Sequence, residues 1–267
     1  MCVCVYVCKF KLPIVVQGGC VIVLFLMPAV SANLFKLPIV VLLFLTPCHM
    51  NANFGHWQCS YSIDAAIDDL EAVIKKLGLR RFHIYGQSYG GILAFEYLKR
   101  VAERKGNGGS ATDDDEGCLS VIFSSTPTSV ELVEASAEAL LDKLKDEDDD
   151  EETLGDRFRL AHQCRLEPMP QPLVDAYAHA GTVWRGTAAI PNYEAKPPSD
   201  SASRMPSAMV MRGEHDFVDH ACVEGWKSCF NHKFVREKVV EGCAHHGLLE
   251  NGRSYGQLVN DFFSEYD

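Results

Sequence analysis

A serine with a glycine two positions to either side, in the motif Gly86-Gln87-Ser88-Tyr89-Gly90, is the clearest candidate for chemistry in this chain. The run 81–85 before the motif is apolar and predicts a strand, and the run 92–101 after it has the apolar spacing of a helix. So sharp a strand-to-helix turn strains the serine backbone, and the glycines leave room where side chains would collide. The motif predicts an exposed, nucleophilic Ser88 hydroxyl, with the Tyr89 backbone N–H at the start of the helix available to an oxyanion. A Gly-rich turn carrying a solvated serine is the alternative.

Candidates for a base and an orienting acid follow the serine, each after a strand-like run. A serine hydroxyl needs both, because a base must accept its proton and a third group must orient that base. The run 208–211 leads into Arg212-Gly213-Glu214-His215-Asp216, and the run 234–240 leads into a loop containing His245 and His246. The spacing favours Asp216 as the acid over Glu214 and Asp219, and it favours His245 as the base over His246. A solvated loop would be the default interpretation of an isolated His-His pair, but the order serine, acid, histidine indicates a triad.

These residues resemble the proline iminopeptidase branch of the α/β-hydrolases, which are serine peptidases that remove N-terminal residues. The resemblance rests on four segments and extends from about Tyr61 to the C-terminus; the segments are 79–91, 124–127, 162–168 and 242–250. It implies an α/β-hydrolase fold, with a mostly parallel sheet flanked by helices and an inserted helical cap. It also implies that Ser88 is the nucleophile, Asp216 the orienting acid and His245 the general base. No metal or cofactor is implied.

The oxyanion loop departs from the family pattern. The family carries a His-Gly-Gly-Pro loop near its N-terminus, and this chain has no such tetrapeptide. The nearest equivalent is Gly18 and Gly19, which follow a strand-like run and are flanked by Gln17 and Cys20 instead of His and Pro. We expect these glycines to supply the second oxyanion donor, beside the Tyr89 N–H. Losing one such donor costs about 3–4 kcal/mol in the transition state. A catalytically impaired protein with this fold is therefore an open alternative.

Recognition of a substrate amine is the second departure. Some family members bind the free amine with an acid directly after the triad aspartate, where this chain has Phe217. Glu167 and Glu194 are the candidate substitutes, because apolar residues flank them. The acidic run 146–152 repels itself, and it predicts a solvated loop between cap helices rather than an amine site. A short peptide and an ester, the latter for a carboxylesterase, are therefore the two candidate substrates.

Composition sets the first 58 residues apart, and the resemblance to the α/β-hydrolases implies a core and a cap in the rest of the chain. Residues 1–58 form an atypical apolar segment, residues 59–127 and 195–267 an α/β-hydrolase core, and residues 128–194 a helical cap with the acidic loop. Within the first region, the motif Phe10-Lys11-Leu12-Pro13-Ile14-Val15-Val16 recurs 25 residues later. The pattern of this region is equally compatible with a signal or membrane anchor and with incomplete core strands. A scrambled gene sequence is the third interpretation.

Net charge and cysteine content limit which binding partners and which cellular compartment we expect for this protein. A net charge of −11 over 267 residues argues against binding nucleic acid. Eleven cysteines without a paired Cys-x-x-Cys spacing argue against a zinc site, and the five beyond residue 60 are typical of buried thiols in a reducing compartment. A cytoplasmic location is favoured. Membrane association or secretion would follow only if residues 1–48 act as an anchor or a signal.

Overall fold

The structure is a computed structural model that describes residues 62–106, 117–146, 150–178, 186–198, 205–230 and 235–267, together with four short strands before residue 44. Its elements in chain order are β1 (Val15–Gln17), β2 (Cys20–Ile22), β3 (Leu24–Phe25), β4 (Ile39–Leu43), α1 (Ile63–Lys76), β5 (Arg81–Gln87), α2 (Tyr89–Gly106), β6 (Gly117–Ser124), α3 (Val130–Leu144), α4 (Glu151–Phe158), the π-helical turn η1 (Arg159–Gln163), α5 (Gln171–Tyr177), the 3₁₀ turn η2 (Gly186–Ala189), β7 (Ser207–Gly213), α6 (His220–Val223), α7 (Trp226–Cys229), β8 (Val235–Val240), α8 (Gly247–Glu250) and α9 (Gly252–Ser264).

A six-stranded sheet organises these elements, in the order β3-β4-β5-β6-β7-β8. Each neighbouring pair from β4 to β8 is parallel, and β3 joins β4 antiparallel. The predicted mostly parallel sheet is therefore confirmed. Because the strands are parallel, their C-terminal ends meet at one edge of the sheet, where open α/β sheets bind ligands.

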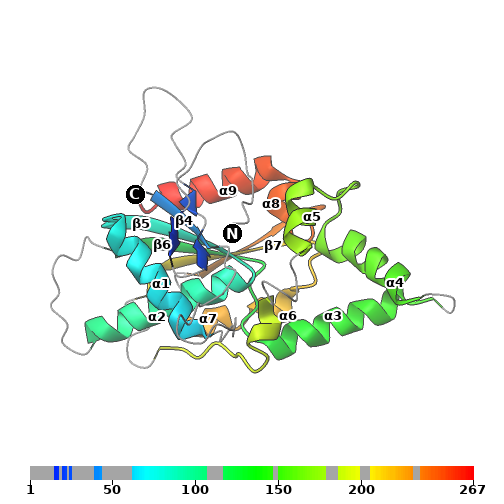
Figure 1. Cartoon of the computed structure of the whole chain (residues 1–267), viewed down its shortest axis with the longest axis horizontal. Coiled ribbons are helices and arrows are strands. Elements are labelled where there is room, and N and C mark those ends of the chain that lie inside the picture. Colours follow the sequence, from blue (N-terminus) through cyan, green and yellow to red (C-terminus); the bar gives the residue numbers. More distant parts are fainter. Residues whose placement is uncertain are drawn as a thin grey trace, which may run out of the picture.

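Helices cover both faces of the sheet. Successive residues of a strand point to opposite faces, so neighbouring residues lie in different cores. Ile84 and Val121 lie in a core shared with α1, α2 and α7, whereas their neighbours Tyr85 and Ile122 lie in a second core shared with α9. Figure 1 shows α9 along one face and α1, α2 and α7 along the other. With apolar residues buried on both faces, β5 and β6 are central strands of the sheet.

The helices largely follow the sequence expectations. Helix α1 begins after Ser62, whose side chain caps it by accepting a hydrogen bond from the Ala65 N–H. The helix after the serine starts earlier than expected, at Tyr89 instead of Ile92, because the first turn carries glycines rather than apolar residues. The acidic run 146–152 is in part helical, since Asp150 caps α4 and the next two residues form its first turn.

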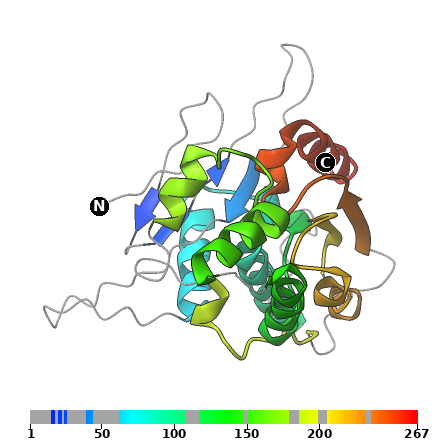
Figure 2. The same ribbon diagram turned by 90° about the vertical axis from the view of Figure 1, so that its right-hand side faces the viewer.

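Among the described residues, five helical elements lie between β6 and β7 in the sequence: α3, α4, η1, α5 and η2. We call them the β6–β7 helices. Figure 2 faces the side of the molecule on which they lie. They fall within the region expected to form a cap, and their importance here is that η1 contacts the loops at the C-terminal edge of the sheet.

The N-terminal region contributes backbone to two sheets. β1 and β2 pair with each other in a separate two-stranded sheet, whereas β3 and β4 extend the main sheet beside β5. Strand β4 lies parallel to β5, the strand that precedes Ser88. None of the described helices is long and apolar enough to cross a membrane.

Candidate active site

Ser88 lies between the end of β5 and the start of α2, with a φ angle of 50°. Positive φ is uncommon for a residue other than glycine, and such strain is concentrated at functional sites. The Ser88 N–H donates to the Ser124 carbonyl oxygen at 2.8 Å, and the Ser88 carbonyl accepts from the Gly91 N–H at 2.9 Å. The turn is therefore fixed to β6 on one side and to the first turn of α2 on the other.

The glycines around Ser88 are required by close backbone contacts. A Cβ atom added to Gly86 would lie 2.5 Å from the Cα of Gly91 and 2.8 Å from the carbonyl oxygen of Gly90. A Cβ atom on Gly91 would collide with the side chain of Thr126, just beyond β6. The start of α2 can thus pack directly on β5 and β6, which places the Tyr89 N–H in the positively polarised first turn of the helix.

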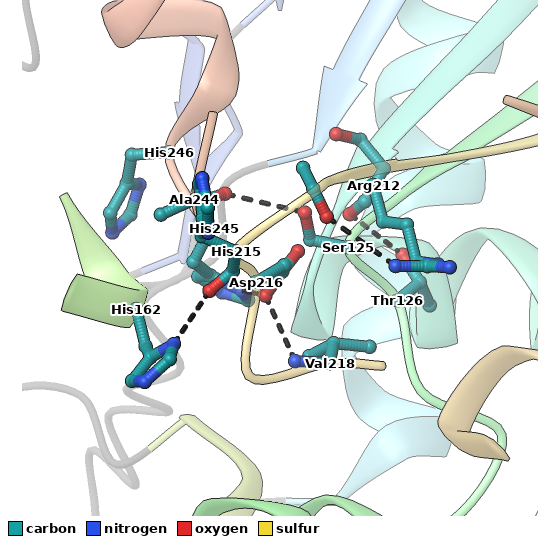
Figure 3. A network of polar contacts seen from close by, with 12 residues as sticks. Ser125, Thr126, His162, Arg212, His215, Asp216, Val218, Ala244, His245 and His246 are labelled. Atoms are coloured by element: carbon teal, nitrogen blue, oxygen red, sulfur yellow. Dashed lines mark hydrogen bonds and ion pairs between the residues drawn. The ribbon is translucent and has the colours of Figure 1, made fainter. Parts of the chain in front are cut away.

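Asp216 and His245 form a hydrogen-bonded pair between two different loops. The Nδ1 atom of His245 lies 2.9 Å from Oδ1 of Asp216, and both residues are buried. The Val218 N–H donates to the same carboxylate oxygen at 2.9 Å, which fixes the carboxylate (Figure 3). A carboxylate facing Nδ1 favours the tautomer with the proton on Nδ1 and leaves Nε2 as the proton acceptor.

The backbone of His245 is held at both of its polar groups. The side-chain nitrogen of Gln87 and the hydroxyl of Ser125 donate to its carbonyl oxygen, at 2.8 and 3.3 Å. Its N–H donates to the carbonyl oxygen of His162, in η1, at 3.2 Å. Gln87 immediately precedes Ser88, so a single side chain joins the serine turn to the loop of the base. Ser125 shares the φ angle of 50° seen at Ser88.

A family profile described as alpha/beta hydrolase fold matches residues 51–252. The chain belongs to the α/β-hydrolase fold family. It is 24% identical over 233 residues to a proline iminopeptidase of Lactobacillus delbrueckii subsp. bulgaricus, which covers 79% of this chain and 74% of that protein. This match confirms the resemblance to the proline iminopeptidase branch that the sequence motifs predicted.

Solved structures agree with this fold. The proline iminopeptidase of Mycobacterium smegmatis superimposes with a TM-score of 0.58 at 23% identity, covering 77% of this chain and 72% of that one. VinJ superimposes with a TM-score of 0.62 at 18% identity, covering 78% and 74% of the two chains. At such identities the likeness establishes the architecture of this α/β-hydrolase.

The rival acids of the α/β-hydrolase have other partners. Glu214 is exposed and accepts a hydrogen bond from the Gly242 N–H at 2.9 Å. Asp219 caps α6 by accepting from the Cys222 N–H at 3.1 Å. Of the three acids weighed from the sequence, Asp216 is the one bonded to His245.

The rings around His245 create an apolar surrounding. Phe217 stacks on the imidazole, with ring centroids 4.3 Å apart, and His246 meets it edge-on at 5.2 Å. Burial, helped by the neighbouring His245, lowers the pKa of His246 to about 3. His246 is therefore neutral near pH 7, and its Nε2 is hydrogen-bonded to the Tyr177 hydroxyl at 2.7 Å.

The two glutamates proposed to bind an amine are exposed, and both are paired with cations. Glu167 lies 3.1 Å from Arg159, and Glu194 lies 2.6 Å from Lys196. Among the described residues, neither carboxylate is hydrogen-bonded to Ser88 or His245. Gly18 and Gly19, expected to complete the oxyanion hole, lie outside the described residues.

A second Ser-His-Asp arrangement connects Ser120, His83 and Asp267. The two ring nitrogens of His83 lie 2.7 Å from the Ser120 hydroxyl and 2.9 Å from an Asp267 carboxylate oxygen. Ser120 is fully buried within β6, so no substrate could reach its hydroxyl. This arrangement satisfies a buried imidazole, whose pKa burial lowers, and we assign it a structural role.

Sequence reasoning missed the residues that hold the His245 loop: Gln87, Ser125 and His162. Gln87 lies inside the serine motif, and His162 lies in a segment that carried the family resemblance, so both had a local signal. Within the described ranges, no three His, Cys, Asp or Glu side chains are grouped as a metal site would require.

Proposed function

We propose that this α/β-hydrolase is a serine hydrolase that works through an acyl-enzyme and releases the N-terminal residue, proline included, from short peptides. The observation that carries the proposal is the buried 2.9 Å pair of Asp216 and His245, whose loop is bonded to the residue next to Ser88. Serine, base and acid arise from three strand ends at one edge of the sheet. This arrangement supports a catalytic triad of Ser88, Asp216 and His245.

The first half of the reaction forms the acyl-enzyme. Nε2 of His245 accepts the Ser88 hydroxyl proton while Oγ attacks the substrate carbonyl carbon. The Tyr89 N–H, at the positive end of α2, stabilises the resulting oxyanion. When the oxyanion collapses, the C–N bond breaks, and His245 gives its proton to the departing amine. Asp216 stabilises the imidazolium throughout.

Water completes the second half. His245 removes a proton from a water molecule, whose oxygen attacks the acyl carbon, and the ester bond to Ser88 breaks as His245 returns the proton to Oγ. The stacked Phe217 excludes water from one face of the imidazole, which leaves its edge to serve as the base.

A fluorophosphonate probe tests the chemistry before any substrate is known. We expect the probe to label the wild-type protein and to fail on Ser88→Ala. Ser254→Ala, which removes an exposed hydroxyl from α9, is the matched control and should be labelled like the wild type. Absence of labelling in the wild type would reject the proposal and favour a catalytically impaired protein.

A carboxylesterase is the second candidate, favoured by the surroundings of His245. Phe217 stands where an amine-binding acid would follow Asp216, and Glu167 and Glu194 are both engaged by cations. A panel of proline amides and p-nitrophenyl esters distinguishes the two candidates. Cleavage of esters alone would overturn the peptidase assignment, and cleavage of N-terminal prolyl amides would support it.

A further inference from the structure

His162 contacts both loops of the candidate triad. Its Nδ1 atom lies 2.8 Å from the carbonyl oxygen of His215, the residue before Asp216. Its own carbonyl oxygen accepts the N–H of His245 at 3.2 Å, and the next residue, Gln163, accepts the N–H of His246 at 3.0 Å. Figure 3 shows the His162 ring directed at the His215 carbonyl. One turn of the β6–β7 helices therefore bonds to the acid loop and to the base loop at once.

A chain of aromatic rings runs alongside these bonds. Phe158, the last residue of α4, lies 5.4 Å from the His162 ring and 5.8 Å from the Phe217 ring. Phe217 in turn stacks on His245. The surroundings of His162 are thus packed as well as hydrogen-bonded, which limits where the imidazole can move.

The local helix geometry supports a specific role for this turn. η1 is a π-helical turn that continues α4, and π turns within helices are rare and frequent at functional sites. The widened turn places the carbonyl groups of two consecutive residues, His162 and Gln163, toward the two consecutive N–H groups of the histidine loop.

We propose that His162 is a positioning residue that sets the alignment of Asp216 with His245 by holding the two loops together. The inference rests on the acyl-enzyme function proposed above. The ring donates from Nδ1 to the His215 carbonyl, and the backbone of the same residue accepts from His245. Misplacement of catalytic groups by about 1 Å can reduce a rate by about 100-fold, so a bond that fixes their loops affects turnover more than substrate binding.

Two substitutions of His162 separate the hydrogen bond from the packing. His162→Ala removes the side-chain donor, whereas His162→Asn keeps an N–H donor close to the position of Nδ1. Leu160→Ala is the matched control, because Leu160 belongs to the same turn and its side chain is 41% exposed. Thermal unfolding of each variant establishes that it folds.

We expect His162→Ala to lower kcat about 10- to 100-fold while KM changes less than about threefold. His162→Asn should recover most of this loss, and Leu160→Ala should match the wild type. Equal kcat in His162→Ala and the wild type would overturn the proposal. Equal loss in His162→Ala and His162→Asn would overturn it too, because packing and not the hydrogen bond would then be responsible.

A spectroscopic measurement tests the same alignment without turnover. The proton shared between His245 Nδ1 and Asp216 should give a downfield NMR resonance in the wild-type protein. We expect this resonance to be lost or shifted in His162→Ala and retained in His162→Asn. If the wild type neither labels nor turns over, the proposed function fails, and the resonance still decides the role of His162: an unchanged signal in His162→Ala overturns it.

Discussion

The side-chain nitrogen of Gln87 donates a hydrogen bond to the backbone carbonyl oxygen of His245, across 158 residues of sequence and a distance of 2.8 Å. The Tyr85 hydroxyl donates to the other end of the same amide at 3.2 Å, which fixes its orientation. The residue beside the candidate nucleophile thus holds the loop of the candidate base.

Replacing Gln87 by leucine should therefore impair both stability and activity. The His245 carbonyl would keep only the longer bond from Ser125, so we expect a loss of about 1–2 kcal/mol in the free energy of unfolding and a fall of about tenfold in kcat. Urea denaturation and steady-state kinetics measure the two effects. Gln257→Leu removes an exposed side-chain hydrogen bond from α9. It should change the free energy of unfolding by no more than about half a kcal/mol and leave kcat unchanged. Indistinguishable effects of the two substitutions would contradict this prediction.

The pair of Asp216 and His245 predicts a large effect of removing one charge. Asp216→Asn should lower kcat by about 10³- to 10⁴-fold, because an amide can donate toward Nδ1 and favour the wrong tautomer. Asp219→Asn, three residues away, changes only a helix cap and should retain activity. Kinetics with whichever substrate class is cleaved test both variants. Comparable activity of the two would remove Asp216 from the triad.

Gly86 predicts a steric effect on stability. Gly86→Ala would place a methyl group against the backbone of Gly90 and Gly91, and we expect it to destabilise the protein by about 3 kcal/mol or more. Gly256→Ala, within α9, meets nothing within 4 Å and should stabilise the protein by about 0.5–1 kcal/mol. Thermal or chemical denaturation compares the pair. A harmless Gly86→Ala would mean that the turn is looser than described.

The lowered pKa of His246 predicts that the stability of the protein depends on pH. Its pKa is about 3 in the folded protein and about 6.5 in an unfolded chain, so the unfolded state binds more protons between these values. Stability from this group is complete above pH 6.5 and falls as the pH drops toward 3, by at most about 1.4 kcal/mol per pH unit.

The measurement compares urea unfolding at pH 7 and pH 5 for the wild type and His246→Gln. The wild type should lose about 1–2 kcal/mol more on acidification than the variant, which has no imidazole to protonate. Parallel losses in the two proteins would show that His246 is not the group responsible.

The parts of this fold that the sequence predicted are those with a strong local pattern. The serine turn was recognisable because two glycines and an apolar strand coincide around Ser88 within a few residues. The choice of Asp216 over Glu214 and Asp219 followed from the position of each acid after a buried strand, and the hydrogen bond to His245 agrees with it.

The parts that could not be predicted depend on distant contacts or on ambiguous local patterns. Glu167 and Glu194 were selected because of apolar neighbours, but neighbours in sequence do not determine burial, and both carboxylates are exposed. The bonds from Gln87 and His162 to His245 join separate parts of the chain, and no periodicity encodes them. The short apolar run at β4 suits a strand and a membrane segment equally, because so short a run has no periodicity that separates the two.

The positive φ angle of Ser125 makes this position one where heat resistance and turnover oppose each other. Glycine would relax the backbone there at once, yet it would also delete the hydroxyl that reaches the His245 carbonyl. Stabilising substitutions chosen from backbone geometry alone would therefore include Ser125→Gly. We expect that substitution to lower the rate of the proposed reaction, because the His245 loop would lose one of its hydrogen bonds.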